Sequence, residues 1–155
     1  MSLTNTKWLV GSTAQTLTAS YAATTAATYA HVGGMIQGIL LVAYTPKTGQ
    51  SNRNASIYLE VSYDDATSWY PISKGEDAAG SAGELVTTVF INSWKLPGAT
   101  GGTVYRFRIP FALGDGGRDE RGYFKSAIIR AKIKEDGSAD FGTLSAFCTT
   151  YGEVD

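Results

Sequence analysis

The stretch SIYLEVSY, which occupies residues 56–63, decides the fold class of this chain. Its apolar side chains fall on every second position, beginning at Ile57, and mostly polar side chains occupy the positions between them. Successive side chains of a β-strand point to opposite faces, so a period of two gives one face for a core and one for water. The stretch therefore predicts a β-strand that is buried on one face.

Two later stretches show the same period of two. Residues Tyr105–Phe111 alternate aromatic and aliphatic side chains with Arg106, Arg108 and Pro110, and residues Ala127–Lys134 alternate apolar side chains with mostly basic ones. Each stretch predicts a strand with one face in the core and one polar face in water. Proline cannot donate a hydrogen bond to a neighbouring strand, so Pro110 favours a sheet edge or a strand end.

Two other stretches, Met35–Thr45 and Leu85–Ile91, are apolar on both faces. A strand of this kind has two interpretations. It is either the centre of a two-layer core, or it stays half exposed until a partner subunit covers it.

The remaining strand candidates are short, and the segments between them are rich in Gly, Asn, Asp, Ser and Pro. Residues 22–27 are too few and too rich in threonine to predict a helix. Loops are expected over residues 47–54, 74–83, 97–102 and 114–122. Further strands are predicted at Lys7–Val10, Gln15–Ala19, Thr28–Val32, Ser68–Ser73 and Thr143–Tyr151.

Together these stretches predict an all-β protein with two antiparallel sheets packed as a β-sandwich, about nine strands and minimal helix. The length of 155 residues is typical of one domain, and no shift in composition divides the chain. We therefore expect a single β-sandwich domain over residues 1–155, in which residues 1–14 are a candidate contact arm.

Composition excludes several classes of protein. Cys148 is the only cysteine, so no disulfide can form within the chain and a disulfide-stapled scaffold is excluded. The net charge of −1 argues against binding to nucleic acid through phosphate neutralisation. No apolar run approaches the length of a membrane span, and no signal peptide is visible. We expect neither nucleic acid nor a membrane as a partner.

The sequence offers little for catalysis. His31 is the only histidine, so no paired-histidine metal site or acid/base pair can be built. It lies in a predicted strand, and no nucleophile elbow of the GxSxG type occurs in the chain. We interpret His31 as a structural or surface residue, and we expect no catalytic residue and no enzymatic activity.

Acidic residues gather at two places in the sequence, and carboxylate oxygens could in principle bind calcium there. The first group is Asp115, Asp119 and Glu120, and the second is Asp136 and Asp140. Neither spacing is that of an EF-hand loop, and glycine follows Asp136, which is a strong signal for a hairpin turn. We therefore expect turns at both places, with no metal site and no cofactor.

Candidate contact residues come from a mixed-charge segment and from two tryptophans. Residues 114–122 interleave both signs of charge, which indicates either a solvated loop or a loop that sets the register against a neighbouring subunit. The tryptophans lie outside the clearest alternating stretches, so each is either an interface anchor or part of the core. The candidate interface residues are Trp8, Trp94, Arg118, Asp119, Glu120 and Arg121.

The sequence SYDDATSW, residues 62–69, resembles the Asp-box, S-x-D-x-G-x-x-W, a hairpin turn of sialidases and other β proteins. Ser62, Asp64 and Trp69 match the motif, while Ala66 stands in place of its glycine. In such a turn the Asp side chain accepts hydrogen bonds from backbone amides and the Trp packs beneath. The motif is a folding device, and it implies no catalysis.

The order of strands and turns resembles small β-sandwich proteins of tailed-bacteriophage virions, which decorate capsids or join head and tail structures. The residues that carry the likeness are Gln15–Tyr21, Ile39–Thr45, Ile57–Asp65 and Trp69–Ile72. The resemblance implies a jelly-roll-like sandwich that self-associates, often as a trimer. It also implies binding to the major capsid protein or another virion protein, in a virion assembled in the host cytoplasm.

The expected function is therefore that of a non-enzymatic virion structural protein, which decorates or stabilises a phage capsid through contacts between many copies. A structural protein of the phage tail or neck is one alternative. A carbohydrate-binding module is another, since exposed aromatic rings can stack on sugars. Its platform would be Tyr58, Trp69, Tyr70 and Trp94. A small lyase or hydrolase ranks last because no convergent set of acids and bases is present.

Overall fold

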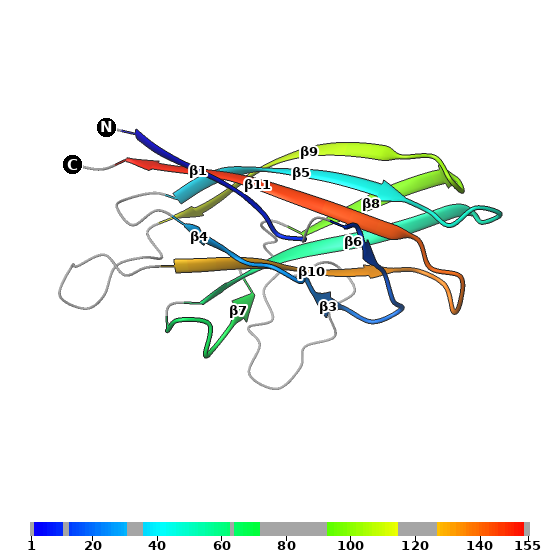
Figure 1. The fold of residues 1–155 in the computed structure, drawn as a ribbon, viewed down its shortest axis with the longest axis horizontal. Coiled ribbons are helices and arrows are strands. Elements are labelled where there is room, and N and C mark those ends of the chain that lie inside the picture. Colours follow the sequence, from blue (N-terminus) through cyan, green and yellow to red (C-terminus); the bar gives the residue numbers. More distant parts are fainter. Residues whose placement is uncertain are drawn as a thin grey trace.

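The computed structural model describes residues 2–10, 13–30, 36–62, 64–71, 93–114 and 127–153. Every regular element within these ranges is a β-strand, and none is a helix (Figure 1). The predicted all-β class is confirmed. In the same ranges there is no helix of the length and apolar character that crossing a membrane requires.

The described strands differ greatly in length, from two residues to twelve, and all of their pairings are antiparallel. Their bounds are β1 Ser2–Trp8, β2 Gln15–Thr16, β3 Ala22–Ala23, β4 Thr28–Ala30, β5 Ile36–Thr45, β6 Ser51–Ser62, β7 Tyr70–Pro71, β8 Ser93–Thr100, β9 Tyr105–Gly114, β10 Ala127–Glu135 and β11 Thr143–Glu153.

The strands form two sheets that lie face to face (Figure 1). The first sheet has the order β1-β11-β5-β9, and β2 also pairs with β11. The second sheet has the order β3-β10-β6-β7, and β4 and β8 also pair with β10 and β6, respectively. The predicted sandwich of two antiparallel sheets is therefore confirmed.

Three of the strand positions are each filled by two short pieces. Strands β1 and β2 both pair with β11, β3 and β4 both pair with β10, and β7 and β8 both pair with β6. The eleven described pieces therefore occupy eight positions, four in each sheet. The chain passes repeatedly from one sheet to the other between consecutive positions. Eight antiparallel positions connected in this way make a jelly roll.

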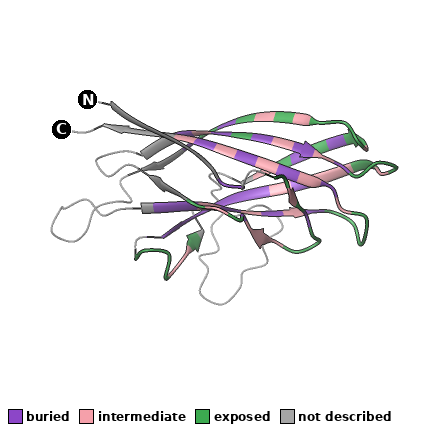
Figure 2. Ribbon diagram, viewed as in Figure 1, coloured by how far each residue is buried: buried purple, intermediate pink, exposed green. Residues whose placement is uncertain are grey.

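The core lies between the sheets and is supplied by alternate residues of the long strands. Figure 2 shows this alternation as buried bands that interrupt β5, β9 and β11. The predicted inward residues of β6, Ile57, Leu59 and Val61, are all buried. Facing them and beside them are Leu40, Val42, Tyr44, Ile109, Phe111, Ile129, Ala131, Ile133, Leu144, Ala146 and Cys148.

The outer face of β6 differs from the prediction of a polar face in water. Tyr58, Glu60 and Ser62 point away from the core, yet each is buried. The ring of Tyr21 packs edge-on against Tyr58, with 4.8 Å between ring centroids, and Arg130 pairs with Glu60. Alternation identified the two faces correctly, but it could not show that neighbouring segments cover the second one.

Two segments predicted as loops contain strand. The predicted loop at 47–54 ends early because β6 begins at Ser51, and most of the predicted loop at 97–102 belongs to β8. The two segments pair with each other, with Pro97 opposite Asn54. Among the described strands β8 pairs with β6 alone, so it is an edge strand, where proline is tolerated. The predicted strand Leu85–Ile91 lies outside the described residues.

A buried polar contact closes one end of the sandwich. Glu135, the last residue of β10, occupies an inward position and is only 1% exposed. Its carboxylate accepts a hydrogen bond from the Tyr44 hydroxyl, 2.7 Å from Oε1, and another from the Gly142 backbone amide. Burial, followed by the contact with Glu135, raises the pKa of Tyr44 above its usual 10.0. The tyrosine therefore remains a hydrogen-bond donor to a buried carboxylate.

The turn between β10 and β11 is tied to the start of β6. Asp136 accepts hydrogen bonds from the backbone and side-chain amides of Asn54, and Arg53 donates to the Asp136 carbonyl. Gly137 has φ of +106°, a conformation that favours glycine, and a Cβ there would collide with the Arg53 guanidinium. The predicted turn is present, and the Asp136 carboxylate binds protein amides.

Candidate interaction surface

The outer face of the first sheet carries apolar side chains at its centre. Strand β5 is central, between β11 and β9, and its residues Leu40, Val42 and Tyr44 point into the core. The alternate residues Leu41 and Ala43 point outward, and Leu41 is 42% exposed. A strand that is apolar on both faces was expected either to be central in a two-layer core or to stay half exposed until a partner covers it. Strand β5 fits both in part, since it is central in its sheet and apolar on its open face.

The strand register arranges this outer face in rows that run across three strands. One row is Phe147, Leu41 and Arg108, on β11, β5 and β9. The neighbouring row is Ser145, Ala43 and Arg106. Phe147 and Leu41 of the first row stand beside the small Ser145 and Ala43 of the second, so the surface is hollowed over these two small side chains.

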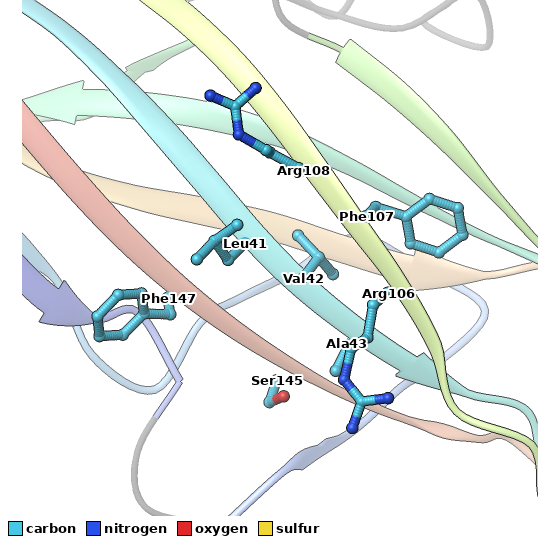
Figure 3. A pocket seen from close by; sticks show the side chains of 8 residues that line it. All are labelled: Leu41, Val42, Ala43, Arg106, Phe107, Arg108, Ser145 and Phe147. Carbon is cyan, nitrogen blue, oxygen red and sulfur yellow. The ribbon is translucent and has the colours of Figure 1, made fainter.

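The hollow has a volume of about 460 Å³ and is open to solvent. Val42 and Phe107 also line it, although Val42 is buried and Phe107 packs against the core. In Figure 3 the outward side chains surround it, with both arginines leaning from β9 toward β5. We call it the arginine-rimmed hollow, and define it by its outward residues Leu41, Ala43, Arg106, Arg108, Ser145 and Phe147.

The charge of this face is positive. Arg106 and Arg108 are exposed, and neither guanidinium has a hydrogen bond or ion pair with another described residue. Around the hollow, the outward positions among residues 39–45, 105–110 and 143–149 carry no Asp or Glu to balance them. Among the described strands β9 lies at one edge of its sheet, and its two arginines and Pro110 are residues that discourage random strand pairing at such an edge.

The candidate interface residues from the sequence fall in three places. Trp8 ends β1, where its backbone lies opposite Phe147 of β11. Trp94 lies opposite Ile57, is half-buried, and packs against the core. Arg118, Asp119, Glu120 and Arg121 lie outside the described residues. Residues 2–8 of the candidate contact arm form β1 and pair with β11 of the same chain.

The Asp-box-like segment forms a tight turn after β6. The Asp64 carboxylate accepts hydrogen bonds from the Ser68 amide, at 2.7 Å, and from the Ser62 hydroxyl, at 2.8 Å. These hydrogen bonds, first of all the one from the Ser68 amide, lower the pKa of Asp64 from its usual 3.8. Ala66 has φ of +64°, which explains why the motif prefers glycine there. The arrangement is structural and engages the Asp64 carboxylate in the turn.

The motif's tryptophan contacts the outer face of the second sheet. The Arg130 guanidinium lies 4.1 Å from the centroid of the Trp69 ring, and its Nε donates to Glu60 over 2.6 Å. A cation stacked on one ring face and paired with a carboxylate holds the turn against β10 and β6. One face of Trp69 is therefore occupied by protein.

The four aromatic residues proposed for a sugar platform do not share one face. Trp94 lies opposite Ile57 and Tyr58 opposite Ser93, so Tyr58 and Trp94 project to opposite faces of the second sheet. Tyr58 is buried, and Arg130 covers Trp69. Tyr70, at 57% exposed, is the large aromatic ring that remains open among the four.

The thiol of Cys148 and the placement of possible metal ligands bear on whether the described residues form a reactive site. Cys148 is buried in the core, and burial raises the pKa of its thiol to about 12, so the reactive thiolate is suppressed. Within the described ranges, no three His, Cys, Asp or Glu residues come together as a metal site would require. His31 lies outside these ranges.

Sequence reasoning missed the arginine-rimmed hollow, although it identified the strands that form it. The alternation of Arg106 and Arg108 with apolar residues was visible, as was the two-sided apolar character of residues 35–45. What the sequence could not supply was the register that sets Ala43 beside Arg106 and Ser145. Without that register, small and large side chains cannot be assigned to rows.

Comparison with known proteins bears on the fold. No protein-family model and no curated protein matches this sequence. Among solved structures, the chain is similar to a chain in the structure of infectious bursal disease virus, Gx strain, with a TM-score of 0.52 and 7% sequence identity. The match covers 97% of this chain but 32% of the viral chain, so this chain spans about a third of the viral chain's length. At this identity the likeness shows the fold alone.

Proposed function

We propose that this chain is a non-enzymatic structural protein of a virus particle. In the finer form of the proposal, many copies of it decorate or stabilise the capsid of a tailed bacteriophage. The copies associate with one another, as a trimer, and with the major capsid protein or another virion protein. The protein is then located in the virion, which is assembled in the host cytoplasm.

The observation that carries the proposal is the jelly-roll fold of the described residues, together with a likeness, over 97% of the chain, to a chain from a virus structure. Jelly rolls are a recurrent fold of viral capsid domains, although the fold also occurs in lectins and enzymes. The likeness supports a particle protein in general terms. The assignment to a tailed bacteriophage rests on the resemblance of strands and turns noted in the sequence.

The apolar outer face of the first sheet supports a role in assembly. A monomer usually places polar residues on the solvent side of an antiparallel sheet. Here Ile39, Leu41, Ala43 and Phe147 form a group of partly exposed apolar positions on neighbouring strands. Contiguous apolar surface of this kind is typical of protein contact sites.

The engagement of the acidic side chains supports the non-enzymatic part of the proposal. A general acid or base must be free to reach a substrate. Four carboxylates of the described residues instead stabilise the fold: Glu60 pairs with Arg130, Asp64 closes a turn, Glu135 accepts from Tyr44, and Asp136 accepts from Asn54.

Electron microscopy of virus particles made with and without this chain tests the proposal. We expect density of jelly-roll shape at repeated, symmetry-related positions on the capsid, and loss of that density when the gene is deleted. Density confined to the tail or neck would support a structural role of the chain in that part of the particle instead of on the capsid. Particles that never contain the chain would refute the proposal.

The oligomeric state is tested separately by light scattering coupled to size-exclusion chromatography. The proposal predicts a mass three times that of the 16.5 kDa chain. A monomer at all concentrations that binds glycans on an array would instead favour the carbohydrate-binding alternative, and would contradict the multi-copy proposal.

A further inference from the structure

We infer that the arginine-rimmed hollow binds an acidic, apolar segment of a different protein chain, in which an exposed aliphatic or aromatic side chain is flanked by carboxylates. This inference deepens the proposed function, on which it rests for the identity of the neighbour as another protein of the particle. It names the surface of this chain that makes the contact and the chemistry of the surface that it contacts.

The apolar part of the argument comes from the shape of the hollow. Ala43 and Ser145 form a low floor, and Leu41 and Phe147 form a wall one row away. An aliphatic side chain placed over Ala43 would cover Leu41, which is 42% exposed, and would contact the side of the hollow that Phe147 lines. Burying such a side chain in an apolar hollow is the usual source of affinity at a contact site.

The choice of an acidic partner comes from the charge of the rim. Arg106 and Arg108 have no counter-charge at the outward positions around the hollow, among residues 39–45, 105–110 and 143–149. A contact that removed their water without supplying carboxylates would leave two buried cations unpaired, which is strongly unfavourable. Arginine also pairs with carboxylates through two parallel hydrogen bonds, so it suits an interface better than a lysine would.

The same argument disfavours a second copy of this chain as the occupant. A copy docked through the identical hollow would bring its own Arg106 and Arg108, and the outward positions around that hollow, among residues 39–45, 105–110 and 143–149, hold no carboxylate. Four guanidinium groups would then lie near one contact without compensation. Copies of the chain can still associate through other surfaces.

The spacing of the arginines suggests how the partner is presented. Residues two apart on a strand lie about 7 Å apart on the same face. An extended partner segment repeats its own side chains at the same interval, so a Glu-x-Leu-x-Glu pattern places three side chains on one face. The two Glu are four residues apart, about 14 Å, so their flexible side chains lean toward the centre to reach the two arginines while the central aliphatic group enters the hollow.

The test is an NMR titration of the full isotope-labelled chain with short blocked peptides. The probe is acetyl-Glu-Ser-Leu-Ser-Glu-amide, compared with counterparts that carry Lys or Gln in place of both Glu. We expect the acidic probe to shift the methyl signals of Leu41 and Ala43. We expect roughly tenfold weaker binding of the Lys peptide, and weaker binding of the acidic peptide at higher salt.

Three variants separate charge from shape. The double variant Arg106→Gln with Arg108→Gln should bind the acidic probe roughly tenfold more weakly, because both ion pairs are lost. Ala43→Phe should block binding while both charges remain. Lys95→Gln removes an exposed cation from the second sheet and should leave binding unchanged. All substitutions are at outward positions, and unchanged core methyl signals would verify the fold.

Equal affinity for the acidic and basic probes would overturn the inference, as would an absence of shifts at the hollow at millimolar peptide. Self-association that Ala43→Phe abolishes would also overturn it, and would assign the hollow to a second copy. The outcome is separable from that of the proposed function. If particles contain the chain but the acidic probe does not bind the hollow, the virion role would stand and the contact with the partner would lie on another surface.

Discussion

Removing one buried hydroxyl, by Tyr44→Phe, should cost this protein far more stability than one hydrogen bond on the surface. The Tyr44 hydroxyl lies 2.7 Å from Glu135 Oε1, and Tyr44 and Glu135 are 0% and 1% exposed. In the variant the buried carboxylate keeps the Gly142 amide as a donor but loses the tyrosine. Hydrogen bonds to a charged group contribute about 1.5–3 kcal/mol, so we expect a loss of about 2–3 kcal/mol.

For a domain of this size, such a loss corresponds to a decrease in Tm of about 5–10 °C. The assay is urea and thermal unfolding at pH 7, followed by circular dichroism and tryptophan fluorescence. The matched control is Tyr105→Phe, because the Tyr105 hydroxyl accepts a hydrogen bond from the Thr100 amide at an exposed site. The control should lose less than about 1 kcal/mol. Equal losses in the two variants would refute the view that a buried carboxylate depends on Tyr44.

Three further predictions concern pH, backbone contact and the thiol. The pKa of Tyr44 is raised in the folded state, so the stability that Tyr44 contributes is complete well below pH 10 and declines as the pH rises through 10 and above. Between pH 10 and 11.5 the wild type should lose about 1 kcal/mol per pH unit more than Tyr44→Phe, and parallel stability curves would contradict this. Gly142→Ala should destabilise the protein by about 2 kcal/mol or more, because the added Cβ would collide with the Thr45 carbonyl oxygen. The control Gly49→Ala, where nothing lies within 4 Å but φ is +88°, should cost only about 1–2 kcal/mol. The reverse order on urea unfolding would count against the close approach of the two backbones. Cys148 should resist a thiol reagent at pH 8 until denaturant unfolds the chain, since its thiol is buried with a pKa of about 12, and rapid labelling of the folded protein would show that the core opens there.

The surfaces of the two sheets differ in a way that bears on assembly. The outer face of the second sheet is partly covered by the chain itself, through Tyr21 on Tyr58 and Trp69 on Arg130. The outer face of the first sheet leaves Leu41 exposed beside two arginines that pair with no other described residue. A partner therefore gains more by covering the first sheet, because apolar surface is still available for burial there.

Period-two alternation was sufficient to predict the fold class. It identified Ile57, Leu59 and Val61 as core residues, and they are buried as expected. It also located the strands that became β9 and β10, because local patterning reflects one face in a core wherever the strand lies in the sheet. Boundaries were less accurate: β8 was largely taken for a loop, since Pro97 and the glycines near it obscure an edge strand.

The sequence by itself therefore determined that this chain forms strands, which residues of the alternating strands β6, β9 and β10 face a core, and that two sheets enclose it. Only the tertiary structure decided which strands are neighbours and in what register, because pairing partners lie far apart in the chain. That register places Ala43 between Ser145 and Arg106 and creates the hollow, and it brings Tyr44 to Glu135 across the core. Alternation repeats every two residues and carries no information about the partner strand, so neither contact could be foreseen.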